Sequence, residues 1–490
     1  MALLSPPSTH TLGECHGQLK HSFSGQTDFH RVELLREGAT LYCSLPFATP
    51  GPRADACRVH QGVLSRFVSK VRGVLQIVSG RGAPAQPAET VLRQRVALHD
   101  VSHLVAVVAP TSALRPGTRG ERTDAEHGTR HSILFYDPST GSRRPLAFRL
   151  DHEFQRDVAC LAFAPSASMS LALGCRNGLC VWNIDGWTKS PRAWMTFLQV
   201  PPQAPVTCLD WSPCGAHLAS ASSAESCVRV WDPSGGDSVT LSTPGLAPAL
   251  LLRWSPAGGT LVAITAAGEL GVWSTRSWAR IASVPLQAMP NSLSFDARGA
   301  HLAVVSQRGR SMGVACLRMP SGDAVGLDLR LAPSLAPRLW TIPEPAAVAG
   351  AAGRLCAWDP LGGRFAIAVG PVADDPTAEG EPSAPDARGS VAASAVADDG
   401  SVGGEGRVAV YSVACDSRGP KFSFLDYVFG PRGAVAGQLD FFPSSPRGSM
   451  LVVAWSKGDD SDGVPFHGGE GITVGALRFY PFVYEAGLDA

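Results

Sequence analysis

An all-β propeller of seven four-stranded blades is the fold class that the sequence predicts, on three observations. One short pattern, a Leu or Cys two places before an aromatic residue, recurs six times between residues 158 and 443. Each copy is followed by a second apolar strand pattern, and in most copies by a third that ends in an aromatic residue. The aromatics of the first four copies recur at intervals of 48, 43 and 41 residues, near the roughly 40–45 residues of a four-stranded blade.

The first strand of each unit alternates apolar and polar residues and runs into a turn, as in VTCLDWSP at 206–213. Alternation with period two is typical of a half-buried strand. The first strands end in the aromatics Phe163, Trp211, Trp254, Phe295, Trp358 and Phe441, and the third strands in Trp182, Trp231, Trp273 and Tyr411. We predict that these ten aromatics are structural and fill the space between wedge-shaped blades, where a small side chain would leave a cavity.

A weaker unit precedes the six copies and brings the expected number of blades to seven. Its strands are QRVALHD (94–100), HLVAVVA (103–109) and SILFYD (132–137), with Leu98 in the place of the first aromatic. The propeller is therefore expected over residues 91–484, after an N-terminal extension of residues 1–90. Seven wedges that close a ring leave no sheet edge exposed.

The third strands end in V-x-V-W patterns that are typical of WD repeats, but the units are divergent. They lack the Gly-His dipeptide that opens a WD unit and the Asp before its third strand, so the usual His–Asp network is expected to be absent. Blade five has no closing aromatic in VACLR at 314–318. Blade six is split by residues 371–405, which hold eight acidic residues and one basic residue. We interpret this acidic insertion as a disordered loop between two strands.

The N-terminal extension contains two candidate elements. VELLREGATLYCSL at 32–45 is strand-like, and we consider that residues 1–52 add a strand to the last blade and close the ring. Residues 54–79 carry valines at helical spacing with basic residues between them, which predicts one amphipathic helix. This helix has two possible roles. It packs against the flank of the propeller, which we favour, or it lies directly on a membrane surface.

Composition limits the classes of partner. Lys+Arg and Asp+Glu are equal at 42 each, so nothing favours direct binding of nucleic acid. The 12 Cys residues form no CxxC pair, which indicates free thiols in a reducing compartment. The chain shows neither a signal peptide nor an apolar run long enough to span a membrane, so we expect a cytosolic or nuclear protein whose membrane contact is indirect.

We find no catalytic, cofactor-binding or metal-binding motif in the sequence. It contains no G-x-S-x-G, Walker A or HExxH pattern and no Cys/His cluster with metal spacing. We therefore expect a binding protein that is not an enzyme and that needs no cofactor. The enzymatic alternative is a propeller hydrolase. Such enzymes place carboxylates or His around the central channel, and sequence patterns do not show whether this chain does so.

The order of the repeat blocks resembles the aladin family of WD-repeat nucleoporins. The resemblance runs from VLRQRVALHDVSHLVAVVAP at 91–110 to about residue 318 and continues more weakly through LDFFPSSPRGSMLVVAWSKG to ITVGALRFYPFV. It covers roughly three quarters of the chain, whereas the first ninety residues match poorly and the insertion at 371–405 is particular to this sequence.

This resemblance implies a structural nucleoporin of the nuclear pore complex at the nuclear envelope. Its implied partners are other nucleoporins, among them a transmembrane nucleoporin that anchors it. It further implies support of nucleocytoplasmic transport of protein and roles at the spindle, and it implies no catalytic residues. The alternative is a cytosolic scaffold such as a substrate receptor of a ubiquitin ligase. Such receptors often carry W-D-x-R at a blade end, and only WSTR at 273–276 approaches this pattern.

Overall fold

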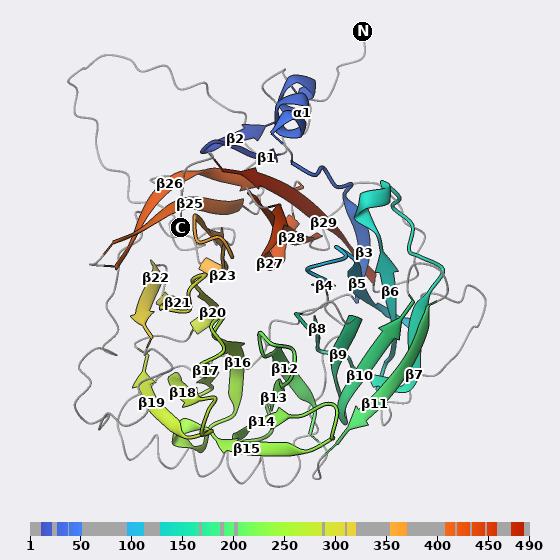
Figure 1. Ribbon diagram of the computed structural model, residues 1–490, viewed down its shortest axis with the longest axis vertical. Helices are drawn as coiled ribbons and strands as arrows, with labels where there is room; N and C mark the ends of the chain where they lie inside the picture. Colours follow the sequence, from blue (N-terminus) through green and yellow to red (C-terminus); the bar gives the residue numbers. More distant parts are fainter. Residues whose placement is uncertain are drawn as a thin grey trace, which may run out of the picture. The chain divides into compact units, whose positions relative to one another are not determined.

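The structure of the chain is a computed structural model (Figure 1). The residues that the structure describes are 11–21, 27–37, 39–50, 96–111, 128–165, 169–186, 191–199, 204–286, 290–308, 311–319, 353–369, 407–416, 419–431, 434–445, 448–457 and 472–484. The expected amphipathic helix at 54–79 and the acidic insertion at 371–405 lie outside these residues. Two compact units divide the chain, and we describe each by itself. Unit 1 comprises residues 1–43, 253–460 and 477–490, and unit 2 comprises 44–252 and 461–476.

Unit 2 contains three four-stranded antiparallel sheets. Their strands are, in order, β4 (Val96–Leu98), β5 (Val105–Pro110), β6 (Arg130–Tyr136), β7 (Arg149–Arg156); β8 (Cys160–Phe163), β9 (Met169–Cys175), β10 (Gly178–Asp185), β11 (Arg192–Leu198); and β12 (Val206–Trp211), β13 (Leu218–Ser222), β14 (Cys227–Trp231), β15 (Ser238–Ser242). Unit 2 also holds β3 (Leu45–Pro50). Each sheet is a meander, in which strands that follow one another in sequence pair with one another. The first strands of successive sheets are in contact: β4 with β8, and β8 with β12.

Most strands of unit 1 form two four-stranded sheets and one three-stranded sheet. They are β16 (Ala249–Trp254), which crosses the unit boundary, β17 (Thr260–Thr265), β18 (Glu269–Ser274), β19 (Arg280–Pro285); β20 (Pro290–Phe295), β21 (His301–Arg308), β22 (Ser311–Arg318); and β23 (Gly353–Trp358), β24 (Arg364–Val369), β25 (Arg407–Asp416), β26 (Gly419–Phe429). β24 and β25 pair residue for residue, so the chain from 370 to 406 connects two adjacent strands.

The last sheet of unit 1 combines strands from both ends of the chain. It runs β2–β1–β29–β28–β27, with β1 (Thr11–Cys15), β2 (Gln18–His21), β27 (Ala434–Ser445), β28 (Gly448–Lys457) and β29 (Ile472–Val483). β1 pairs with β29 in parallel, at Glu14 opposite Phe482 and Cys15 opposite Val483. N-terminal residues therefore add strands to the last sheet, as considered from the sequence.

The expectation of seven complete blades is corrected by these sheets. Six of the sheets formed by the described residues have the four or more strands of a complete blade. The sheet β20–β21–β22, at the place of the expected fifth blade, has three. Within the described part of the chain, the structure thus shows six complete blades. The sequence pattern predicted a first, second and third strand in each unit more reliably than a fourth, because the fourth strands carry no recurrent motif.

A repeated turn joins the first and second strands of four units. A Ser or Asp follows the aromatic end of the first strand, and three residues later a Gly donates its N–H to the carbonyl of that residue at 2.8 to 3.0 Å. The pairs are Ser212 and Gly215, Ser255 and Gly258, Asp296 and Gly299, and Asp359 and Gly362. Each Gly has φ between 67° and 82°, in the left-handed region that a side chain disfavours. In the third pair His301 also contacts the Asp296 carboxylate at 3.0 Å.

The prediction of a strand at 32–45 was wrong for the first residues of this range, which belong to a helix. The structure places the α-helix α1 at Thr27–Arg36, and α1 is the only α-helix of the described residues (Figure 1). Asp28 in its first turn and Arg36 in its last turn stabilise the helix, because each charge interacts favourably with the nearer end of the helix dipole. Leu34 is fully buried and packs with Cys15 of β1 and Val483 of β29, and this packing outweighs the short strand-like alternation. No helix of the described residues has the length and apolar character needed to cross a membrane.

Candidate functional site

All ten predicted blade aromatics are buried at 8% exposure or less. Phe163, Trp211, Trp254, Phe295 and Trp358 end the first strands β8, β12, β16, β20 and β23, and Phe441 lies within the first strand β27. Trp182, Trp231, Trp273 and Tyr411 lie on the third strands β10, β14, β18 and β25. The structure therefore distributes them over the sheets and does not gather them at one surface site.

Trp211 shows how such an aromatic connects two sheets of unit 2. Its indole N–H donates to the carbonyl of Ala162 on β8 at 3.0 Å. Its ring belongs to a buried cluster with Leu209 and Leu179. Gly174 on β9 lies at the same junction, where a Cβ would come within 3.0 Å of the Val206 side chain on β12. The two sheets therefore approach closely at this junction.

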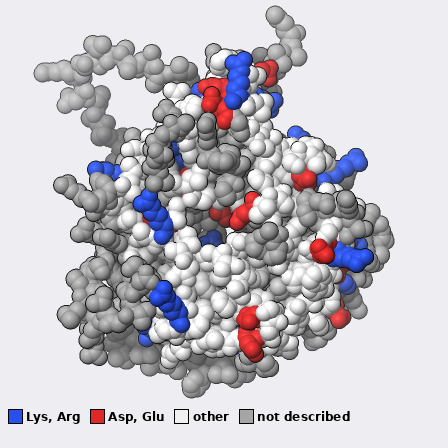
Figure 2. Space-filling view, viewed as in Figure 1, with Lys and Arg blue, Asp and Glu red and all other residues white. Residues whose placement is uncertain are grey.

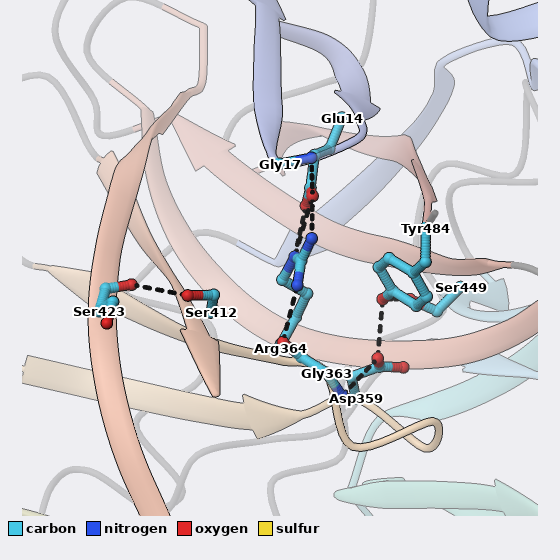
Figure 3. Close-up of polar contacts among 9 residues, drawn as sticks. All are labelled: Glu14, Gly17, Asp359, Gly363, Arg364, Ser412, Ser423, Ser449 and Tyr484. Atoms are coloured by element: carbon cyan, nitrogen blue, oxygen red, sulfur yellow. Dashed lines mark hydrogen bonds and ion pairs between the residues drawn. The ribbon is translucent and has the colours of Figure 1, made fainter. Parts of the chain in front are cut away.

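A buried network of polar side chains lies in unit 1, around Arg364 (Figure 3). Arg364 is the first residue of β24, and its guanidinium forms a bidentate pair with Glu14 of β1. The Arg364 Nε lies 2.8 Å from Glu14 Oε2. Glu14 is fully buried and the Arg364 side chain is 8% exposed. Burial would lower the pKa of Arg364, but the hydrogen bonds and the charge of Glu14 outweigh it, so the pKa is raised.

A second carboxylate, Asp359, lies in the turn between β23 and β24 (Figure 3). Tyr484, just after β29, donates its hydroxyl to Asp359 Oδ2 at 2.7 Å, and Ser449 lies 2.5 Å from the same hydroxyl. Asp359 also accepts the backbone N–H groups of Leu361 and Gly363. Burial raises the pKa of Asp359, against the lowering effect of these hydrogen bonds.

Arg364 links the two carboxylates. Its guanidinium carbon lies 4.8 Å from the centre of the Tyr484 ring, in a cation–π contact. Burial, together with the charge of Asp359, raises the pKa of Tyr484 well above its usual range. The phenol therefore stays protonated and serves as a hydrogen-bond donor. Residues from β1, β24, β28 and the end of β29 thus form one network in unit 1.

A second set of contacts fixes the hairpin of β1 and β2 to β26. The His21 Nε2 lies 3.2 Å from the Asp426 carboxylate, and the Thr11 hydroxyl accepts the N–H of Phe429 at 3.1 Å. The rings of His21 and Phe429 meet edge to face at 5.6 Å. The N-terminal hairpin is thereby attached to two sheets of unit 1, its own and that of β26.

The chemistry of the Arg364 network is that of a structural anchor. The Glu14 carboxylate is paired with Arg364 and accepts the N–H of Gly17, and the Asp359 carboxylate has a hydroxyl and two N–H donors. No group of three or more His, Cys, Asp or Glu side chains with metal-binding geometry occurs among the described residues. The arrangement can hold the N-terminal hairpin on the sheet of β24.

Sequence patterns did not indicate this network. Arg364 opens the apolar strand RFAIAV, and a charge at a strand end is ordinarily solvated. Its partner Glu14 lies 350 residues away, in an extension whose pairing no motif indicated. A signal was available in the C-terminal YPFVY, where the closing Tyr484 has a polar end that needs a buried partner.

Comparison with known proteins supports the fold and one resemblance. No protein-family model matches the chain. Aladin of Arabidopsis thaliana is 30% identical over 241 residues, which cover 44% of this chain and 52% of aladin. The resemblance to the aladin family that was drawn from the repeat blocks is confirmed. The chain spans about half the length of this curated relative.

One solved structure shows the architecture, and a second has a lower similarity. The β-propeller domain of Cps50 (Swd1) from Myceliophteria thermophila has a TM-score of 0.50 and 13% identity, and the match covers 79% of this chain and 96% of that domain. The WD40 domain of coronin from Toxoplasma gondii matches with a TM-score of 0.46 and 12% identity, over 82% of this chain and 84% of that one. The first match shows the fold alone: the chain is an all-β propeller of the WD type.

Proposed function

We propose, from this similarity to aladin, that the chain is a structural nucleoporin, a WD-repeat scaffold that binds other proteins in the nuclear pore complex. The observation that carries the proposal is the alignment of 241 residues at 30% identity. We extend it to a location at the nuclear envelope, to support of nucleocytoplasmic transport of protein, and to other nucleoporins as partners. A transmembrane nucleoporin would anchor the chain there.

The structure supports a binding role over an enzymatic one. The polar network of unit 1 is buried and its carboxylates are engaged by donors from the same unit, so it offers a substrate neither an exposed acid nor an exposed nucleophile. On the face shown in Figure 2, the charged side chains of the described residues are scattered and of both signs. Such a face favours neither nucleic acid nor an anionic membrane as a direct partner.

Proximity labelling from the intact protein tests the proposal. A biotin ligase fused to the full chain is expected to label nucleoporins, including a transmembrane one, well above a ligase fused to an unrelated cytosolic propeller. Enrichment of a cullin adaptor instead of nucleoporins would support the ubiquitin-ligase receptor and refute the pore scaffold. Turnover of a panel of esters or glycosides by the purified chain would show that the protein is an enzyme.

A further inference from the structure

Four turns of unit 1 are in contact with one another and form one surface, which we call the turn surface. They connect β16 to β17, β18 to β19, β20 to β21 and β23 to β24, at residues 255–259, 275–279, 296–300 and 359–363. The Thr275 hydroxyl donates to the carbonyl of Gly258 at 2.7 Å, which joins the second turn to the first. A Cβ at Gly299 would clash with the Ser255 hydroxyl, and a Cβ at Gly362 would lie 3.7 Å from a side-chain carbon of the third turn.

The exposed charged side chains of the turn surface are all positive. Arg276 of the second turn and Arg298 of the third are exposed, and so is Arg280, which directly follows the second turn. All residues of the four turns are described, and their acidic residues are Asp296 and Asp359. Both are buried, at 5% and 0% exposure, and each accepts hydrogen bonds from its own unit. The turns therefore direct their carboxylates inward and leave the guanidinium groups at the surface.

Trp278 places an aromatic ring between Arg276 and Arg280 in the sequence. Its φ of 56° lies in the left-handed region, which residues other than glycine rarely adopt. The turn is held in this conformation by packing, because the ring of Trp278 meets the buried Trp254 edge to face at 5.9 Å. Its N–H also donates to the Ser274 carbonyl at 2.9 Å. The Trp278 side chain is only partly buried, so part of it is available to a partner.

Apolar side chains complete the turn surface. Pro256 and Pro360 are exposed, and Leu361 is 41% exposed. Arg, aromatic and apolar side chains together are typical of protein interfaces. A nucleic-acid site would instead require a basic stripe on a domain with excess positive charge, whereas this chain has 42 basic and 42 acidic residues. The composition of the turn surface therefore favours a peptide as the partner.

We propose that the turn surface binds an acidic segment of a partner protein. Its carboxylates pair with the three arginines, and its apolar side chains pack against Leu361 and the ring of Trp278. Charge complementarity selects this occupant, because each guanidinium can bind a carboxylate through two parallel hydrogen bonds. The inference names the chemistry of a partner for the proposed scaffold and rests on that binding function.

Selection from a library of short displayed peptides, with the purified full-length chain as the bait, tests the inference. Peptides rich in Asp and Glu are expected to be enriched over peptides rich in Lys. A fluorescent synthetic peptide of the enriched sequence is then titrated with each variant. R276Q/R280Q/R298Q is expected to weaken binding roughly tenfold, or about 1.4 kcal/mol, as expected for the loss of three exposed ion pairs. R276E/R280E/R298E is expected to select Lys-rich peptides instead.

The matched control is R143Q/R144Q/R192Q, which removes three exposed arginines of unit 2 and changes the net charge equally. Its affinity for the acidic peptide is expected to equal that of the wild type. The six arginines are exposed, so the thermal melt of each variant is expected to match the wild type. L361S is expected to weaken binding without changing its dependence on salt, because it removes an apolar contact and no charge.

Three outcomes would overturn the inference. The first is a selection that shows no preference for acidic peptides. The second is an equal loss of affinity in R276Q/R280Q/R298Q and in the control, which would show an effect of net charge alone. The third is binding of single-stranded RNA or of anionic vesicles, in place of the peptide, that R276Q/R280Q/R298Q loses. A tagged wild type at the nuclear rim without acidic enrichment would refute the inference alone, and enrichment without a rim signal would refute only the proposed place in the pore.

Discussion

Arg364 and Glu14 form a buried, bidentate ion pair although 350 residues separate them in the chain. Glu14 belongs to the N-terminal strand β1 and Arg364 opens β24, so the pair attaches the first described strand of the chain to a sheet formed late in the sequence. Tyr484, Asp359 and Ser449 complete the network around it. The N-terminal hairpin is therefore an integral part of unit 1.

Glu14→Gln is expected to lower the free energy of unfolding by about 3–5 kcal/mol, because it leaves the buried Arg364 without its counter-charge. Urea unfolding followed by tryptophan fluorescence measures the change. The matched control is Arg130→Gln, which breaks the more exposed pair with Asp151 and is expected to cost at most about 1 kcal/mol. A double replacement of Glu14 and Arg364 by Met is expected to recover most of the loss. Equal effects of Glu14→Gln and Arg130→Gln would contradict the role given to the pair.

The raised pKa of Asp359 makes stability depend on pH. Burial raises its folded-state pKa above the ordinary 3.8. The contribution of this group to stability is therefore fully present below pH 3.8 and is lost as the pH rises through the folded-state pKa. Asp359→Asn removes this dependence, so the stability of the variant relative to the wild type is expected to rise with pH over this window. Urea unfolding of both proteins at a series of pH values from 4 upward tests this prediction. A difference in the free energy of unfolding between variant and wild type that does not change with pH would contradict it.

Trp211→Ala is expected to destabilise the protein by about 3–5 kcal/mol, because it leaves a cavity between two sheets and removes the donor to the Ala162 carbonyl. Trp211→Phe keeps most of the packing and is expected to cost less than half as much. The control is Trp194→Ala on β11, since that side chain is 56% exposed and its loss is expected to cost less than about 1 kcal/mol. Thermal unfolding ranks the three variants, and a loss at Trp194 as large as that at Trp211 would refute the packing role.

Cys214 is expected to be among the first thiols to react with iodoacetamide at neutral pH. It is exposed, and the hydroxyl of Ser212 lowers the pKa of its thiol, which increases the thiolate fraction. Cys356 is buried, and burial raises its pKa to about 12, so it is expected to react only after unfolding. Mass spectrometry of timed samples measures both rates. Ser212→Ala is expected to slow the labelling of Cys214, and an unchanged rate would show that the hydroxyl does not activate the thiol.

The local signals of the fold were readable from the sequence, whereas its long-range contacts were not. Trp182, Trp231 and Trp273 lie on the third strands β10, β14 and β18, and a buried aromatic on each of these strands follows from their period-two pattern alone. The pairing of Glu14 with Arg364 depends on which strand of the N-terminal extension meets which sheet, and no local pattern encodes this choice. The strand-like reading of Val32 and Leu35 failed for a related reason, since the helix is selected by the contact of Leu34 with β1 and β29.

Imaging of the full-length protein with a fluorescent tag, in cells that express it at its natural level, tests the central claim most directly. A pore scaffold is expected to give a continuous nuclear rim that coincides with a pore marker and that is lost when the transmembrane anchor is depleted. A diffuse cytosolic signal, unchanged by that depletion, would contradict the account.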